Sequence, residues 1–268
     1  MKKLLFLILF LVLNQTARSQ STASEQVVTF EMNVPQLNTQ KKIWVYLPID
    51  YKKSTKSYPV IYMFDAQNLF DAETSYVGEW KVDEYLDTLT KGQSIIIGIE
   101  HGNEKRIEEL TPYAHASYGG GKGKAFLNFI IDTLKPYVDN NYRTKSDVRN
   151  TSIIGSSLGG LMAFYAVVNH SDTFGQAGVF SPAFWINPEI YDLAETNEIP
   201  KSSRFYFLVG TDEGESMVPN QERMVKLLLD KGISATQIKN YIIEGGQHNE
   251  AFWSNHFPDA YQWLLNEN

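Results

Sequence analysis

The chain has 268 residues, of which 43% are hydrophobic and 13% aromatic, and its formal net charge is -7. This composition excludes a disordered or fibrous protein, and the length is sufficient for one large α/β core. The acidic balance disfavours nucleic acid as a partner, because binding to phosphate backbones depends on clustered Lys and Arg. The chain contains no cysteine, which excludes disulfides and a cysteine-linked lipid anchor.

Residues 1–19 have the layout of a secretory signal peptide. Lys2 and Lys3 precede the apolar run Leu4 to Leu13, and a polar stretch ends in Ala17-Arg18-Ser19. The apolar run is too short to span a membrane, which requires about 20 residues. We therefore expect cleavage after Ser19 or Gln20, export to the periplasm or the medium, and no stable membrane insertion afterwards. Cleavage would change the net charge from -7 to about -10.

Val27 to Val34 and Lys42 to Leu47 predict two strands joined by a polar turn. After Tyr58-Pro59, strand and helix patterns alternate along the rest of the chain. The expected strands are Val60 to Phe64, Ser94 to Ile99, Ser152 to Gly155, Gln176 to Phe180, Phe205 to Val209 and Lys239 to Ile243, and the expected helices lie near Trp80 to Leu89, Ala125 to Tyr142, Leu158 to His170, Asn220 to Lys231 and Ala251 to Leu265. The strand patterns are mostly unalternating, as in strands buried on both faces. The alternation predicts an α/β protein with a mostly parallel sheet and helices on both faces, in one domain over residues 20–268.

The segment Gly155-Ser156-Ser157-Leu158-Gly159 interrupts one of these strand and helix pairs. Glycines permit a sharp turn, and the turn from a parallel strand into a helix is where such sheets bind ligands. A G-x-S-x-G pattern between a strand and a helix predicts a nucleophile elbow, with Ser157 as the nucleophile and Ser156 as a small residue that the turn requires. An ordinary glycine-rich turn is the alternative interpretation.

A serine hydroxyl needs a base before it can attack a substrate, and the chain offers five histidines. His248 stands in Gly245-Gly246-Gln247-His248, just past the last expected strand, where an α/β-hydrolase presents its base. Its position therefore favours His248. The other histidines lie in the middle loops, at a helix end or inside the last expected helix: His101, His115, His170 and His256.

The acid of a catalytic triad should lie between the serine and the histidine in chain order. The expected strand Phe205 to Val209 is closed by Gly210, and Thr211-Asp212-Glu213 follows it. Either carboxylate could orient a histidine, so this pattern leaves Asp212 and Glu213 both open.

These segments together resemble the "Putative esterase" family of α/β-hydrolases, which includes S-formylglutathione hydrolases, feruloyl and acetyl xylan esterases and siderophore esterases. The resemblance rests on Val60 to Asp71, on Arg106 with Glu109 and Pro112, on the elbow, on Ser181 to Trp185, on Gly210 to Glu213 and on Gly245 to His248. It runs from about residue 27 to the end of the chain and implies an α/β-hydrolase fold with serine esterase activity. Ala66 departs from the family, which often has glycine at that position.

The resemblance also decides the acid. The family places its acid three residues after the glycine that closes the strand, which points to Glu213 and leaves Asp212 to bond nearby loop amides. Two backbone amides normally receive the charge that develops on an ester carbonyl oxygen. One belongs to the residue after the nucleophile, Leu158, and the resemblance implies Gln67 for the other.

Three tryptophans lie near the expected catalytic loops: Trp80, Trp185 and Trp253. They are candidates for the wall of an acyl or aryl pocket, although core packing explains each nearly as well.

Other motifs fail on inspection. Gly119 to Lys124 looks like a phosphate-binding loop, but the positions that require glycine and Ser/Thr hold Tyr118 and Ala125, so we expect a mobile loop. His248 and His256 lack a third ligand at metal-binding spacing, and the sequence has no H-E-x-x-H. We therefore expect no metal and no cofactor.

These observations predict an exported serine esterase that acts on a small-molecule or polysaccharide-linked ester through an acyl-enzyme. An acyltransferase on the same fold and a non-catalytic binding protein are the alternatives. The sequence does not specify the ester or the oligomeric state.

Overall fold

The computed structural model describes residues 21–265, and the expected signal peptide lies outside them. The central sheet has eight strands in the order β1-β2-β4-β3-β7-β8-β9-β10. Their bounds are β1 Val27–Val34, β2 Thr39–Tyr46, β3 Val60–Phe64, β4 Ile95–Ile99, β7 Thr151–Ser156, β8 Gln176–Phe180, β9 Arg204–Gly210 and β10 Ile238–Ile243. A separate hairpin pairs β5, Ala114–His115, with β6, Gly119–Gly120.

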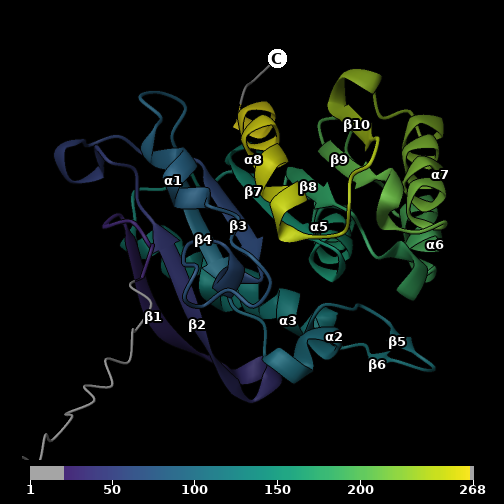
Figure 1. Cartoon of the computed structure of the whole chain (residues 1–268), viewed down its shortest axis with the longest axis horizontal. Helices are drawn as coiled ribbons and strands as arrows, with labels where there is room; N and C mark the ends of the chain where they lie inside the picture. The colour runs from purple at the N-terminus through teal and green to yellow at the C-terminus, as the bar shows by residue number, and fades with distance from the viewer. Residues whose placement is uncertain (1–20, 266–268) are drawn as a thin grey trace, which may run out of the picture.

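The strands from β4 to β10 pair in parallel, whereas β2 is antiparallel to both of its neighbours, β1 and β4. The expectation of a mostly parallel sheet is therefore confirmed. Figure 1 shows β1 and β2 on one side of the molecule and β9 and β10 on the other. The carboxyl ends of the parallel strands share one edge, and the loops that follow them can assemble a site there.

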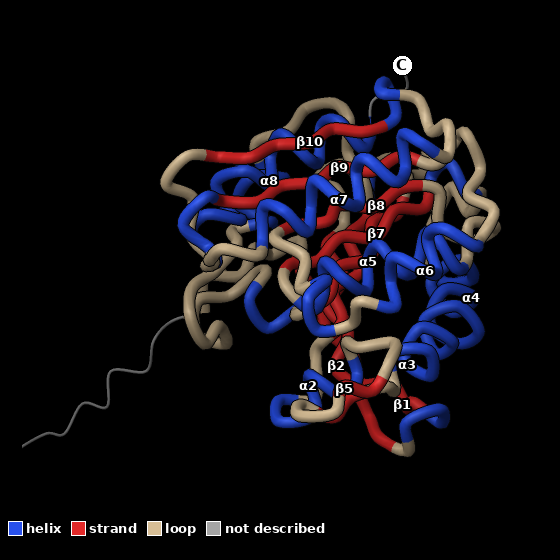
Figure 2. Tube along the Cα trace, turned by 90° about the vertical axis from the view of Figure 1, so that its right-hand side faces the viewer, coloured by secondary structure: helices blue, strands red, loops and turns tan. Residues whose placement is uncertain are grey.

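The helices cover both faces of the sheet, as expected. Their bounds are α1 Val82–Asp87, α2 Arg106–Glu109, α3 Gly123–Phe129, α4 Lys135–Asn141, α5 Leu158–Asn169, α6 Glu189–Thr196, α7 Met217–Asp230 and α8 Glu250–Leu265. Residues of α3 to α7 pack in one hydrophobic cluster, and residues of α1 and α8 pack in a second cluster. In Figure 2 the strands form a red layer among these helices.

Consecutive residues of the buried strands point to opposite faces, which explains why their sequences do not alternate with polar residues. In β3, Tyr62 and Phe64 belong to the cluster of α3 to α7, whereas Ile61 and Met63 belong to the cluster of α1 and α8. Each strand of this kind therefore supplies both cores.

Two local expectations are wrong. Lys239 to Ile243 was expected to be buried on both faces, but β10 is the last strand of the sheet and Tyr241 is 40% exposed. Gly119 to Lys124 was expected to be a loop, but it contains β6 and the start of α3, and the N–H of Gly121 donates to Thr111 Oγ1 at 3.0 Å. A strand's place in the sheet is not visible in local sequence patterns, and the two-residue strands of the hairpin are too short to give a strand pattern.

The helical expectations differ mainly in extent. The stretch from Ala125 to Tyr142 is helical, but a π-helical turn, Ile130–Leu134, separates α3 from α4. Pro136 follows this turn and cannot donate a backbone hydrogen bond, which favours such an irregularity. Helix α6 was not expected, and α1 is shorter than the predicted stretch from Trp80 to Leu89.

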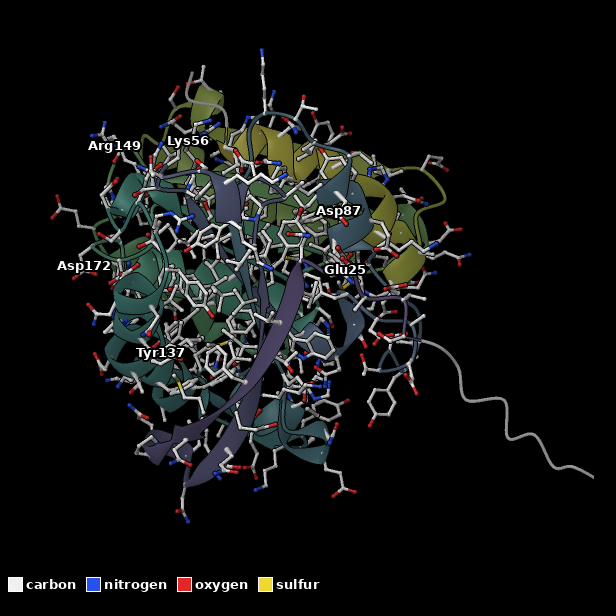
Figure 3. All side chains as sticks on the ribbon, turned by 90° about the vertical axis from the view of Figure 1, so that its left-hand side faces the viewer. Glu25, Lys56, Asp87, Tyr137, Arg149 and Asp172 are labelled. Carbon is white, nitrogen blue, oxygen red and sulfur yellow. The ribbon has the colours of Figure 1, made fainter. Side chains whose placement is uncertain are left out.

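The segment before β1 is bound by carboxylates of α1 and of the loop before it. Ser21 Oγ donates to Asp71 at 2.6 Å, the Ser24 N–H donates to Asp83 Oδ2 at 2.7 Å, and Ser24 Oγ donates to Asp87 at 2.6 Å. Figure 3 shows Glu25 and Asp87 on the same side of the molecule. The Oδ1 atom of Asp83 is buried and has no hydrogen-bond partner in the described part of the chain.

We predict that Asp83 makes stability depend on pH. Burial, with a contribution from Glu84, raises the pKa of Asp83 to about 8 from an ordinary value of 3.8. Between these values the folded state holds a proton that the unfolded state has lost, so stability falls as pH rises from about 4 to 8. Asp83→Asn should therefore be more stable than the wild type at pH 8 by about 1 kcal/mol or more, and nearly equal at pH 4. Thermal melts across this range test the prediction, and parallel pH profiles of the two proteins would contradict it.

Candidate active site

Ser157 sits at a strained turn between β7 and α5. Its backbone has φ 58 and ψ -118, a conformation that L-residues rarely adopt and that occurs at nucleophile elbows. The Ser157 N–H donates to the Phe180 carbonyl at 2.9 Å, which ties the turn to the end of β8. The turn therefore has the backbone geometry that the sequence pattern predicts.

The glycines of this turn are required by close packing. A Cβ on Gly155 would lie 2.4 Å from the backbone carbon of Gly159, and a Cβ on Gly160 would lie 2.7 Å from the Phe180 carbonyl oxygen. Real Cβ atoms do not approach backbone this closely, so α5 could not pack against β7 and β8 with larger residues there.

His248 and Glu213 meet at the same edge of the sheet. His248 Nδ1 and Glu213 Oε2 lie 2.8 Å apart, and the Glu213 side chain is fully buried while that of His248 is 36% exposed. A carboxylate at Nδ1 fixes the ring tautomer that leaves Nε2 free to accept a proton. The Asp212 side chain is exposed, and its backbone N–H donates to the Gly246 carbonyl at 2.9 Å.

The Glu213 carboxylate is held by two further donors. Its Oε1 accepts from the Gly210 N–H at 2.7 Å and from Ser181 Oγ at 2.6 Å. Ser181 is fully buried and in turn accepts from Trp253 Nε1 at 2.8 Å. Sequence reasoning assigned no role to Ser181, although its position directly after β8 was a usable signal.

Two glycines bring the Glu213 and His248 loops together. A Cβ on Gly210 would lie 2.1 Å from the Gly246 carbonyl oxygen, so the end of β9 touches the loop after β10. The same contact includes the hydrogen bond between Asp212 and Gly246. This backbone contact sets the distance between the two side chains.

A cavity of about 770 Å³ opens above the elbow and contains Ser157, His248 and Trp253 in its lining. Its remaining lining residues are Asp65, Tyr76, Val77, His101, Asn103, Glu104, Arg106, Ser156, Asn249 and Glu250. Within the described residues Ser157 and His248 do not form a hydrogen bond. In enzymes without substrate, the hydrogen bond between a nucleophile and its base is often long and shortens only when substrate binds. The cavity thus holds a strained serine beside a histidine that is oriented by a carboxylate.

The two backbone amides that the sequence analysis proposed for an oxyanion hole are unpaired. Among residues 21–265, no backbone hydrogen bond engages the N–H of Leu158, which begins α5, or the N–H of Gln67 in the turn after β3. Free amides of this kind are what an oxyanion hole requires.

Ala66, where the family often has glycine, is fully buried. It packs against Gly98 of β4, where an added Cβ would lie only 2.9 Å from the Cβ of Ala66. The alanine is therefore accommodated by a glycine in β4.

An ion pair forms another part of the cavity wall. Arg106 donates from Nε to Asp65 Oδ1 and from a terminal nitrogen to Oδ2, both at 2.8 Å. Burial would raise the pKa of Asp65, but the charge and hydrogen bonds of Arg106 outweigh it and hold the pKa below its usual value. His101 lies 3.9 Å from Asp65, and burial lowers the pKa of its ring. Since Asp65 has φ 58, this pair fixes the strained turn that carries Gln67.

The predicted pocket tryptophans occupy different environments. Trp253 lines the cavity and packs edge-on against His248, with ring centroids 5.0 Å apart. Trp80 is buried and stacks on Phe180 at 5.4 Å, in the core behind the cavity. Trp185 is 45% exposed and contacts Tyr118. Among the three, the structure places only Trp253 in the cavity lining.

Carboxylates that could hold a metal lie elsewhere. Within the described residues, Glu79, Asp83 and Glu84 form the one group of three or more potential ligands, with ligand atoms within 4.8 Å of one another. None of them lines the cavity, and clustered acidic residues are not by themselves a metal site. We assign no metal to them.

The mostly parallel sheet, the helices on both of its faces and the sharp turn between β7 and α5 define an α/β-hydrolase fold. The model of the family described as "Putative esterase" matches residues 35–264. The chain belongs to this family of esterases, as the sequence analysis predicted.

The chain is also similar in sequence to curated proteins and in fold to solved structures. The chain is 26% identical to "Uncharacterized protein YbbA" of Bacillus subtilis over 241 residues, which cover 85% of this chain and 94% of YbbA. It is 27% identical to the endo-1,4-beta-xylanase/feruloyl esterase of Xylanibacter ruminicola over 217 residues, which cover 78% of this chain and 27% of that protein. The crystal structure of the BES protein from Bacillus cereus superposes with a TM-score of 0.76 at 19% identity, covering 95% of this chain and 100% of that one. In residues 21–265, no helix combines the length and apolar character needed to cross a membrane.

Proposed function

We propose that this esterase hydrolyses a carboxylic ester through a Ser157, His248 and Glu213 triad and an acyl-enzyme intermediate. The observation that carries the proposal is the 2.8 Å contact between the buried Glu213 carboxylate and His248, which lines the same cavity as Ser157. His248 Nε2 takes the proton of the Ser157 hydroxyl as the oxygen attacks the ester carbonyl. The same ring then protonates the departing alcohol, and water repeats the sequence to release the acid.

The oxyanion that forms in each step is stabilised by the backbone amides of Gln67 and Leu158 in this proposal. Their freedom from backbone hydrogen bonds supports the role, because a preorganised donor needs no rearrangement when charge develops. The Asp65 and Arg106 pair contributes indirectly, by holding the turn on which Gln67 lies.

The proposed substrate is a small-molecule or polysaccharide-linked ester, and the proposed location is the periplasm or the medium. Names among the relatives support the first point: one is an iron(III) salmochelin esterase and another a siderophore triacetylfusarinine C esterase. The charge, apolar run and small residues in the first 19 positions support the second.

Hydrolysis of p-nitrophenyl acetate tests the proposed function. We expect a burst of p-nitrophenol that approaches one equivalent per enzyme if deacylation is slower than acylation, followed by steady turnover. The same assay with added glycerol or sugar distinguishes hydrolysis from acyl transfer, because a transferase would form an acylated alcohol in place of acetate. A protein that gives neither burst nor turnover would be a binding protein instead.

We further predict that the two neighbouring carboxylates of the acid loop have separable roles. Glu213→Gln should lower kcat by roughly 10² to 10⁴ with little change in KM, because orientation of the histidine matters most in the transition state. Asp212→Asn is the matched control, and any effect should fall on stability, since its side chain is exposed and contributes no contact to His248. Circular dichroism verifies folding of both variants. A crippled Asp212→Asn beside a near-normal Glu213→Gln would reverse the assignment.

A further inference from the structure

Glu250 is a cavity residue that the proposed mechanism does not use. It lies two residues after His248, lines the same cavity as Ser157 and is only 8% exposed. Buried carboxylates are normally paired or fully hydrogen-bonded. Its partners therefore need to be identified.

The partners of Glu250 are few. Asn68 Nδ2 donates to Oε1 at 3.4 Å, which is a long hydrogen bond. In residues 21–265 no other residue donates to Oε2 and no ion pair includes it, and the other nearby donor is the backbone N–H of Glu250 itself. Glu250 lines the cavity, and Oε2 is the carboxylate oxygen that no other residue engages.

The charged neighbours do not satisfy this carboxylate. Arg106 is the arginine of the cavity wall, but two of its nitrogens bond Asp65 and no ion pair joins it to Glu250. Burial raises the pKa of Glu250 and the Asp65 carboxylate adds to the effect, whereas the backbone N–H of Glu250 itself and the charge of Arg106 oppose it. Glu250 also begins α8, where an acidic residue favours the helix dipole, but that role does not need a side chain inside a cavity.

We propose that the free oxygen of Glu250 forms a subsite that accepts a hydrogen bond from a substrate hydroxyl, so the preferred esters carry a hydroxyl close to the ester bond. This inference rests on the proposed esterase function. A hydroxyl replaces the water that solvates the oxygen in the free enzyme, whereas an apolar group would remove the water and leave the oxygen without a partner. Carboxylate groups are disfavoured at the same place, since Asp65, Glu104 and Glu250 all line the cavity.

The test compares matched esters that differ in a hydroxyl. Propyl acetate and glycerol monoacetate differ on the alcohol side, and ethyl butyrate and ethyl 3-hydroxybutyrate differ on the acyl side. For each pair, a pH-stat gives the ratio of kcat/KM for the hydroxylated ester to that for the apolar ester. We expect a wild-type ratio of about ten or more in at least one pair.

The variants assign this ratio to Glu250. Glu250→Ala should lower the ratio at least about fivefold, and Glu250→Gln, which keeps the shape and one neutral acceptor, should lower it by about threefold. Glu189→Ala is the matched control: Glu189 also begins a helix but is exposed and does not line the cavity, so the ratio should not change. If the alanine variant fails to fold, the isosteric glutamine variant decides the question alone.

Each outcome bears on a specific claim. A wild-type ratio near one in both pairs, or a high ratio that persists in the Glu250 variants, overturns the subsite. The proposed esterase function still holds in that case, provided that hydrolysis depends on Ser157. If none of the four esters nor p-nitrophenyl acetate is hydrolysed in a Ser157-dependent manner, the proposed function fails and the subsite fails with it.

Discussion

We expect Ser157→Ala to abolish both ester hydrolysis and labelling by a fluorophosphonate probe. The elbow presents one strained serine to the cavity, and without its hydroxyl no acyl-enzyme can form. Removal of a triad nucleophile typically lowers kcat by a factor of about 10⁴ to 10⁶. The residual rate comes from the oxyanion hole and from substrate binding. The measurement is p-nitrophenyl acetate hydrolysis together with mass spectrometry of the labelled protein.

Ser156→Ala is the matched control, because Ser156 is adjacent, lines the same cavity and is the last residue of β7. It should retain fluorophosphonate labelling at Ser157. Labelling that survives Ser157→Ala unchanged would refute the nucleophile, and an adduct on Ser156 would replace it.

His248→Ala should cost a similar factor, about 10⁴ to 10⁶ in kcat, because the base and the nucleophile act as one unit. The fold should survive, since the His248 side chain is 36% exposed in a loop and its main polar partner is Glu213. Circular dichroism and thermal melts check the fold, and p-nitrophenyl acetate hydrolysis measures the activity.

His256→Ala serves as the control for this prediction. His256 lies inside α8, packs against Phe252 and does not line the cavity. An inactive His256→Ala combined with an active His248→Ala would show that the base is misassigned.

Local patterns predicted the sheet, the elbow and the approximate place of the histidine, because each of these depends on nearby residues. The run of apolar residues in β3 specifies a buried strand, and the glycines around Ser157 specify a sharp turn. Neither depends on the order of the strands in the sheet. The exposed edge position of β10 was missed, since a strand's neighbours are set by topology.

Chain order was enough to propose the residues of the candidate site, but it could not predict the contacts that join distant segments there. The hydrogen bonds from Ser181 to Glu213 and from Trp253 to Ser181 span 32 and 72 residues, and no spacing rule connects them. The same holds for the approach of Gly210 to Gly246, which only the folded backbone reveals. The choice between Asp212 and Glu213 required family resemblance, because adjacent carboxylates have equivalent chemistry.

The position of Trp253 gives this enzyme an internal optical probe. Its indole lies edge-on to the His248 ring at 5.0 Å and donates its N–H to Ser181, which holds the Glu213 carboxylate. Indole emission responds to nearby charge and to hydrogen bonding at the ring nitrogen. In the proposed mechanism, a change in the protonation of His248 should therefore alter the fluorescence of Trp253, and acylation should be observable in the native protein without an added dye.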